Sequence, residues 1–382
     1  MHKREIDYSR PQKINFIGSA EASLRLAESL LESPAKSLRQ KFIHSVCCTT
    51  HRVDFIRLKI FLIFRFVVNL LRHADDSSNR DNKSHIARND GNKKGKIVRA
   101  RRFKTQADID RYIAQGAGRG EGDTYQPWLR VQDVPSKGRS RKILGSKTGR
   151  LHHLLSDAEY YYLLLLEFSE RVVDIREGFP IFPTQEAQKI AAELGIRYPR
   201  YKSTTLPFVM TTDFMVTIEE NGRRRLAART VKTDDELIEP TKLKRRLELF
   251  ELEKEILSSQ GVDDWSIVTP NAIGESLTHN LKWLHPSTKI DSEILGLGFQ
   301  NQFLETLDLY TSQQLKTSSL IRLVTGRTNM SYSDGVNLFK YLIWSKAIQF
   351  DIANQELHMG KICPPLNLIT PKQIGNVHQK AA

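Results

Sequence analysis

Residues on either side of a predicted tight turn could together cleave a phosphodiester bond. Asn-Gly at 221–222 lies between two predicted strands, 209–219 and 223–232, and predicts a hairpin with a two-residue loop. In that register Asp213 faces Thr230, and Lys232, two residues further on, shares their face of the ribbon. We therefore predict that a carboxylate, a hydroxyl and an ammonium group converge on one side of the hairpin.

These side chains suit the chemistry of a metal-dependent nuclease. Mg²⁺ prefers carboxylate oxygens and keeps several waters, and it polarises phosphoryl oxygens and lowers the pKa of a bound water. Asp213 would supply a carboxylate, and the carbonyl of Val231 could reach the same ion. Lys232 could orient or deprotonate the water, or stabilise charge on the phosphate. In the alternative interpretation, Asp213 only ends a strand and Lys232 only protects a sheet edge.

A further carboxylate lies at the start of a predicted helix. Ser156 and Glu159 form the Ser-x-x-Glu pattern of a capping box, and every residue from Tyr160 to Leu166 is aromatic or aliphatic. An all-apolar helix of this kind is expected to be buried. A helix start is also a well-positioned place for a metal ligand, so capping and catalysis are compatible roles for Glu159.

The surrounding pattern predicts a mixed α/β sheet flanked by helices. Pro180 and Pro183 are expected to end the first strand, and Pro240 suits the first turn of a helix with an apolar stripe. The expected elements are a helix at 160–168, strands at 171–177, 209–219 and 223–232, a helix from Pro240, a strand at 265–269 and a helix at 277–284.

From about Asp291 onward the pattern becomes helical. Ser333 can cap a helix that runs to about Ile348, and 348–359, with Asn354 near its centre, could form a small hairpin. Helices followed by a short hairpin suggest a winged-helix domain, and a helical bundle with an irregular tail is the alternative. We predict a poorly structured extension and linker at 1–98, a nuclease domain at 99–285, and a winged-helix domain with a tail at 286–382.

The composition points to a polyanionic partner. The 382 residues suggest two or three domains, and the net charge of +14 favours nucleic acid. Glycines at 116–122 indicate a loop. The basic stretch after it could follow a DNA backbone or could be a solvated loop. Its cationic residues are Lys137, Arg139, Arg141, Lys142, Lys147 and Arg150.

The cysteines argue against a disulfide-rich or zinc-binding protein, and the one long apolar run does not predict a membrane anchor. Cys47, Cys48 and Cys363 form neither a disulfide framework nor a C-x-x-C zinc pair, which fits free thiols in a reducing cytosol. The run 56–71 is short and carries three cationic residues, so we predict no membrane anchor and no signal peptide. The polar stretch 73–96 indicates a disordered linker.

Several sequence motifs, which follow one another in a fixed order, resemble those of a known family. Residues 109 to about 285 resemble TnsA, the endonuclease family of cut-and-paste transposons that use separate proteins for the two strands, and 286–382 resembles its winged-helix domain more loosely. The matching blocks are R-G-E-G-D-T-Y-Q-P-W-L, V-P-S-K-G-R-S, K-T-G-R-L-H-H-L-L-S-D-A-E, V-V-D-I-R-E, V-M-T-T-D-F and the Val231-Lys232 pair.

This resemblance implies a restriction-endonuclease-like fold in which Glu159 is the catalytic glutamate, Asp213 the metal-binding aspartate and Lys232 the active-site lysine. It implies Mg²⁺, with Mn²⁺ as a substitute and two ions per site. The sequence departs from the family at two positions: Thr230 and Gly178 stand where Gln is common. A threonine hydroxyl can still hold a water.

The resemblance also implies a function and partners. The protein would cut the 5′ ends of a transposon in a bacterial cytoplasm, beside a TnsB-like transposase that cuts the 3′ ends and a TnsC-like ATP-dependent regulator. Two alternatives are a stand-alone restriction or repair nuclease and a non-catalytic DNA-binding regulator. Because the resemblance begins near Val98, we expect 1–97 to be dispensable or to reflect an over-long reading frame.

Overall fold

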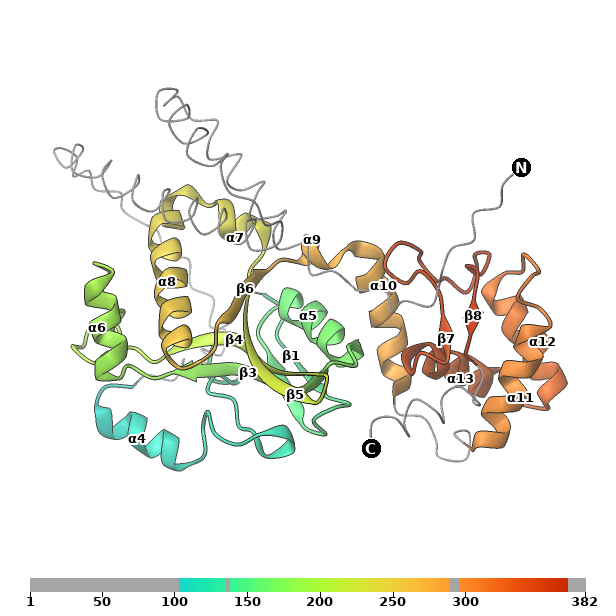
Figure 1. The fold of residues 1–382 in the computed structure, drawn as a ribbon, viewed down its shortest axis with the longest axis horizontal. Helices are drawn as coiled ribbons and strands as arrows, with labels where there is room; N and C mark the ends of the chain where they lie inside the picture. The colour runs from blue at the N-terminus through green and yellow to red at the C-terminus, as the bar shows by residue number, and fades with distance from the viewer. Residues whose placement is uncertain (1–102, 135–137, 289–295, 370–382) are drawn as a thin grey trace, which may run out of the picture. The chain divides into compact units, whose positions relative to one another are not determined.

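A computed structural model describes residues 103–134, 138–288 and 296–369 (Figure 1). The predictions for 1–98, including Cys47, Cys48 and the apolar run at 56–71, lie outside these residues, as does Lys137. Within the described part, Asp235–Glu251 groups apart from the unit that holds Lys94–Asp234 and Leu252–Ala382. No helix in the described ranges is both long and apolar enough to cross a lipid bilayer.

The predicted mixed sheet is confirmed, with four strands in the order β3-β4-β5-β6. Strand β3 pairs antiparallel with β4, β4 antiparallel with β5, and β5 parallel with β6. Figure 1 shows the sheet between α5 (Asp157–Phe168) and the second half of α8 (Pro240–Ser259). The strands are β3 (Val172–Ile181), β4 (Met210–Glu220), β5 (Arg223–Val231) and β6 (Asp264–Val268).

The register of the β4–β5 hairpin is the predicted one. Phe214 pairs with Arg229 at one end and Glu220 with Arg223 at the other. The loop residues Asn221 and Gly222 have φ values of 53° and 71°, the positive values that a type I′ turn requires. Because the twist of this turn matches that of the strands, the local sequence is sufficient to set the pairing.

Apolar side chains cover both faces of the sheet. On one face α5 (Asp157–Phe168) packs Tyr162 and Leu163 against Phe214 and Ala227. On the other face the second half of α8 (Pro240–Ser259), with Leu252 and Ile256, packs with α6 (Gln185–Glu193) against Met215 and Ala228. Apolar residues on both faces therefore bury the end of the hairpin far from the turn, where residues 227–231 of β5 are buried, whereas residues 223–226 beside the turn are exposed.

One prediction for the N-terminal half is wrong. Pro180 does not end the first strand, since it lies inside β3 and pairs with Thr211. Proline is tolerated there because β3 is an edge strand. In the basic stretch, Arg141 and Lys142 lie in the antiparallel hairpin of β1 (Arg141–Leu144) and β2 (Leu151–Leu154), and Lys147 and Arg150 lie in the turn between these strands. The other elements before the sheet are α4 (Gln106–Ala114) and the 3₁₀ turn η2 (Gly122–Thr124).

The C-terminal part is helical from α11 onward, as predicted, and has its own core. Ser331, and not Ser333, caps α13 by accepting from Asp334 N. The predicted hairpin within 348–359 is wrong, because β7 pairs with a strand that lies further along the chain. These elements are α11 (Leu297–Asp308), α12 (Thr317–Thr328), α13 (Tyr332–Trp344), β7 (Ile348–Gln349) and β8 (Asn367–Leu368).

Four further elements lie along the chain between β5 and α11. Helix α10 carries Leu277 and Leu281, which pack with Leu164 and Phe168 of α5. The connecting elements are α7 (Asp234–Ile238), α9 (Pro270–Ile273), α10 (Glu275–Leu284) and the 3₁₀ turn η3 (His285–Thr288). The contact fixes the buried, C-terminal end of α5, whose other end carries Glu159.

Candidate active site

Glu159 lies in the first turn of α5, and its carboxylate is held by the residues that precede the helix. Ser156 caps the helix by accepting from Glu159 N over 3.1 Å. In return, Glu159 Oε1 accepts from Ser156 Oγ over 3.0 Å, and Oε2 accepts from Leu155 N over 2.8 Å. The capping prediction is confirmed, and the same contacts orient the carboxylate.

Asp213 and Lys232 meet where β4 and β5 pass the end of their ladder. Lys232 Nζ donates to Asp213 Oδ2 over 2.9 Å and to the carbonyl oxygen of Val231 over 2.8 Å. Val231 N donates to the same Asp213 oxygen over 2.7 Å. About a quarter of each charged side chain is exposed. The structure thus brings together an aspartate, a lysine and a backbone carbonyl at a place that solvent can reach.

Glu159 and Asp213 influence each other electrostatically. Burial raises the pKa of Glu159 well above its usual range, and the negative charge of Asp213 raises it further. Lys232 acts in the opposite direction on the same carboxyl. A second cation between the two carboxylates would relieve this repulsion, so the donor set fits a divalent metal ion.

Thr230 has a different environment from the other predicted site residues. It is buried, and its hydroxyl donates to Glu253 Oε1 over 2.6 Å. Trp265 Nε1 donates to the same oxygen over 3.0 Å. Burial raises the pKa of Glu253 to about 7, and the charge of Asp213 contributes to the increase. Thr230 therefore links the hairpin to a carboxyl group on α8.

Glu253 was missed by the sequence analysis. It lies three residues after Phe250 and three before Ile256, inside the apolar stripe of α8. An acidic residue in a buried stripe costs free energy unless it is hydrogen-bonded. The presence of a glutamate in this apolar stripe was therefore the feature of the sequence that could have identified Glu253. Its partners Thr230 and Trp265 lie on two other elements, β5 and β6, so its hydrogen bonds depend on the tertiary fold and not on the local sequence.

Two arginines of the basic stretch are held by carboxylates. Arg141 Nε donates to Asp157 Oδ1 over 3.0 Å. Arg150 is mostly buried and donates to both carboxylate oxygens of Glu177 over 2.8 and 2.6 Å. Arg150 therefore stabilises the fold, and the interpretation that it follows a DNA backbone is wrong.

Comparisons with known proteins show one family. The family model "TnsA-like endonuclease N terminal" matches residues 169–270, which include Asp213 and Lys232, and "TnsA endonuclease C terminal" matches residues 273–352. The chain is 36% identical over 202 residues to the Transposon Tn7 transposition protein TnsA of Escherichia coli, covering 52% of this chain and 71% of that relative.

These matches confirm the predicted resemblance and the predicted restriction-endonuclease-like class of the mixed sheet and its helices. The winged-helix assignment of the C-terminal part stays a prediction. By family model, sequence identity and coverage, the chain belongs to the TnsA family of transposon endonucleases.

Proposed function

We propose that this protein is the metal-dependent DNA endonuclease subunit of a heteromeric transposase and that it cleaves the 5′ ends of the transposon. The observation that carries the proposal is the meeting of Asp213, Lys232 and the Val231 carbonyl at the end of the hairpin. Glu159 adds a carboxylate whose charge couples to that of Asp213. Family membership and the net charge of +14 support DNA as the substrate.

Glu159, Asp213 and the Val231 carbonyl would hold the metal ion. All three are oxygen donors, the type that Mg²⁺ prefers, and Mn²⁺ would substitute. Bound there, the metal would polarise a phosphoryl oxygen and acidify a water, and we propose two ions per site. This set contains two carboxylates and one backbone carbonyl. Within the described residues, no group of three or more His, Cys, Asp and Glu side chains could hold a metal.

Lys232 has the geometry of a charge-stabilising or water-orienting group. Its ammonium already contacts Asp213 Oδ2 and the Val231 carbonyl, so these oxygens attract positive charge. The ion pair with Asp213 stabilises the protonated lysine. We therefore assign Lys232 to orienting the water or stabilising the phosphate charge, and not to removing a proton.

The partners follow from the family. We propose that a TnsB-like transposase cuts and joins the 3′ ends, and that a TnsC-like ATP-dependent regulator contacts this protein in a bacterial cytoplasm. We also propose that 99–285 form the nuclease domain and that 286–382 form a winged-helix domain. The purified chain alone would cleave little DNA, because an unregulated nuclease would damage its host.

The test is single-turnover nicking at the transposon's 5′ ends by the reconstituted complex in Mg²⁺. Asp213→Ala and Glu159→Gln should abolish nicking while assembly with the partners survives. Glu219→Gln is a matched control, because Glu219 is also an ion-paired carboxylate of β4 but lies beside the hairpin turn, bonded to Arg224. Near wild-type nicking by either active-site variant would refute the assignment. Efficient cleavage by the chain alone would favour a stand-alone nuclease.

A further inference from the structure

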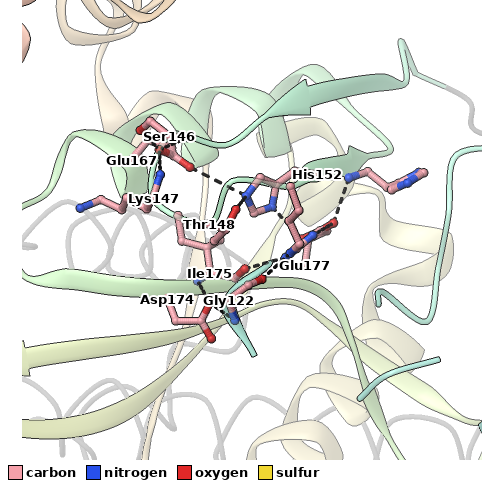
Figure 2. Close-up of polar contacts among 11 residues, drawn as sticks. Gly122, Ser146, Lys147, Thr148, His152, Glu167, Asp174, Ile175 and Glu177 are labelled. Atoms are coloured by element: carbon pink, nitrogen blue, oxygen red, sulfur yellow. Dashed lines mark hydrogen bonds and ion pairs between the residues drawn. The ribbon is translucent and has the colours of Figure 1, made fainter. Parts of the chain in front are cut away.

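A buried carboxylate on β3 organises a polar network around β2. Glu177 is almost fully buried, and besides the two bonds from Arg150 it lies 2.8 Å from His152 Nδ1 and accepts from His153 N over 2.9 Å. Figure 2 shows His152 between Glu177 and a second buried carboxylate, Glu167 of α5. The β1–β2 hairpin is thereby fixed to the central sheet.

Glu177 carries a permanent negative charge. Burial by itself would raise the pKa of Glu177, but hydrogen bonds from His152 and Arg150 outweigh this effect and lower the pKa to about 2. Arg150 also donates to the carbonyl oxygens of Ile175 and Gly122, over 2.7 and 3.1 Å. Arg150 therefore connects Glu177 to the backbone of β3 and of the 3₁₀ turn η2.

The backbone of β2 connects this network to the active site. His153 N lies in β2, and Leu155 N lies one residue beyond its end, in the segment that leads into α5. His153 N donates to Glu177 Oε1, and Leu155 N donates to Glu159 Oε2. Two carboxylates therefore bind the backbone of one segment, the first structural and the second in the candidate active site.

The segment between the two contacts has little freedom. Leu154 lies between His153 and Leu155 and is completely buried in the core that α5 shares with the sheet. Ser156, the next residue, caps α5 and donates to the other oxygen of Glu159. A shift of β2 along its own direction would thus move both hydrogen-bond donors of the Glu159 carboxylate.

We propose that Glu177 is a positioning residue for the metal site: it fixes β2 through His153 N, and β2 in turn holds the carboxylate of Glu159 in the orientation that binds the metal. The inference rests on the proposed metal role of Glu159. Partners that orient a metal ligand from behind typically change metal affinity by about 10–100-fold when they are removed.

Glu167 provides a matched control. It is a buried carboxylate of the same network, and it accepts from Ser146 N and Lys147 N over 3.0 and 3.1 Å. These contacts hold the turn between β1 and β2, at the far end of β2 from Leu155. Glu167→Gln therefore perturbs the network without removing the contact to His153 N.

The experiment measures Mn²⁺ binding to the full chain by calorimetry, without DNA, together with the thermal unfolding midpoint. Glu177→Gln should weaken Mn²⁺ binding by about tenfold, and Glu167→Gln should leave it at the wild-type value. Glu177→Asp keeps a charge opposite Arg150 but withdraws the carboxylate from His153 N, so it should weaken binding even if the glutamine variant fails to fold. Raising the Mn²⁺ concentration should restore nicking by a Glu177 variant and not by Glu159→Gln.

The outcomes separate the two proposals. Folded Glu177 variants with wild-type Mn²⁺ affinity, or an equal loss in Glu167→Gln, would overturn the positioning role. If Glu159→Gln itself bound Mn²⁺ normally, the metal assignment under the proposed function would fail, and the positioning role would fail with it. If Glu159→Gln lost binding while Glu177→Asp and Glu177→Gln kept it, only the positioning role would fail.

Discussion

Lys232 Nζ donates to Asp213 Oδ2 over 2.9 Å and joins the end of β5 to β4 at the edge of the hairpin ladder. The same ammonium contacts the Val231 carbonyl oxygen over 2.8 Å. The ammonium group of Lys232 therefore bridges two of the oxygen atoms proposed as metal ligands. This position places its positive charge beside the site where the metal ion and the phosphate would bind.

Lys232→Ala should abolish most nicking and should lower the unfolding free energy by about 1–3 kcal/mol. Removal of a group that stabilises charge in a transition state costs about 10²–10³-fold in rate. The cost in stability arises because the ion pair is only a quarter exposed, and Asp213 would keep only the hydrogen bond from Val231 N among the contacts described above. The measurements are single-turnover nicking and urea unfolding. Arg224→Ala, which breaks the ion pair with Glu219 at the turn, is the control. Nicking within a few-fold of wild type would contradict a role for Lys232.

Thr230→Ala should reduce nicking by roughly five- to a hundredfold, because loss of one hydrogen bond costs about 1–3 kcal/mol. The hydroxyl donates to Glu253, so its loss would disturb the carboxyl group that lies behind Asp213. Thr230→Val has nearly the same volume and isolates the hydroxyl. A variant as inactive as Asp213→Ala would make Thr230 a primary catalytic group, and a fully active one would make the hydroxyl a spectator.

Glu253 should make the protein less stable at alkaline than at acidic pH. Its folded pKa of about 7 lies above the ordinary value of 4.5, so between these values the folded state binds more protons than the unfolded state. Stability is therefore lost as the pH rises from about 4.5 through 7, by an amount on the order of 3 kcal/mol.

Glu253→Gln removes this titratable group. Between pH 5 and pH 8 the wild type should therefore lose more unfolding free energy than the variant does. Urea unfolding of both proteins at the two pH values measures this difference. The subtraction cancels the other titrating groups, and Glu177, with its pKa lowered to about 2, stays charged throughout this range. A difference that does not depend on pH would show that Glu253 keeps an ordinary pKa.

Asn280 should be the residue of α10 whose loss most weakens its contact with the C-terminal part. Its side chain is fully buried, donates to the carbonyls of Ile352 and Gln355 over 2.9 and 2.7 Å, and accepts from Leu357 N over 2.9 Å. Asn280→Ala leaves buried backbone groups unsatisfied and should destabilise the fold by about 3 kcal/mol.

Urea unfolding followed by tryptophan fluorescence would measure this loss. Asn354→Ala is the control, because Asn354 is exposed and its side chain donates to Asp351, three residues earlier. Equal effects of the two substitutions would contradict the prediction. The contact also bears on the predicted boundary at 285, since deletion of 286–382 would remove every one of these partners of Asn280.

The sequence alone determined the local part of this protein. The Asn221-Gly222 turn determined the register in which Asp213 falls opposite Thr230, because turn geometry and the two-residue period of a strand are local properties. The helix cap at Ser156 could likewise be predicted from the sequence, because its hydrogen bond joins residues only three positions apart. The helices and strands of the sheet followed from these periods, and the family followed from the ordered blocks of residues.

Only the tertiary structure decided what depends on distant partners. The place of Pro180 inside a strand depends on β3 being an edge of the sheet, and the pairing of β7 with β8 skips the nearer hairpin. Glu253 and Glu177 are buried acids whose stabilising donors come from other elements, such as Thr230 of β5 and Arg150 before β2. A buried charge is tolerated only where several donors converge on it, and that convergence is a property of the folded chain.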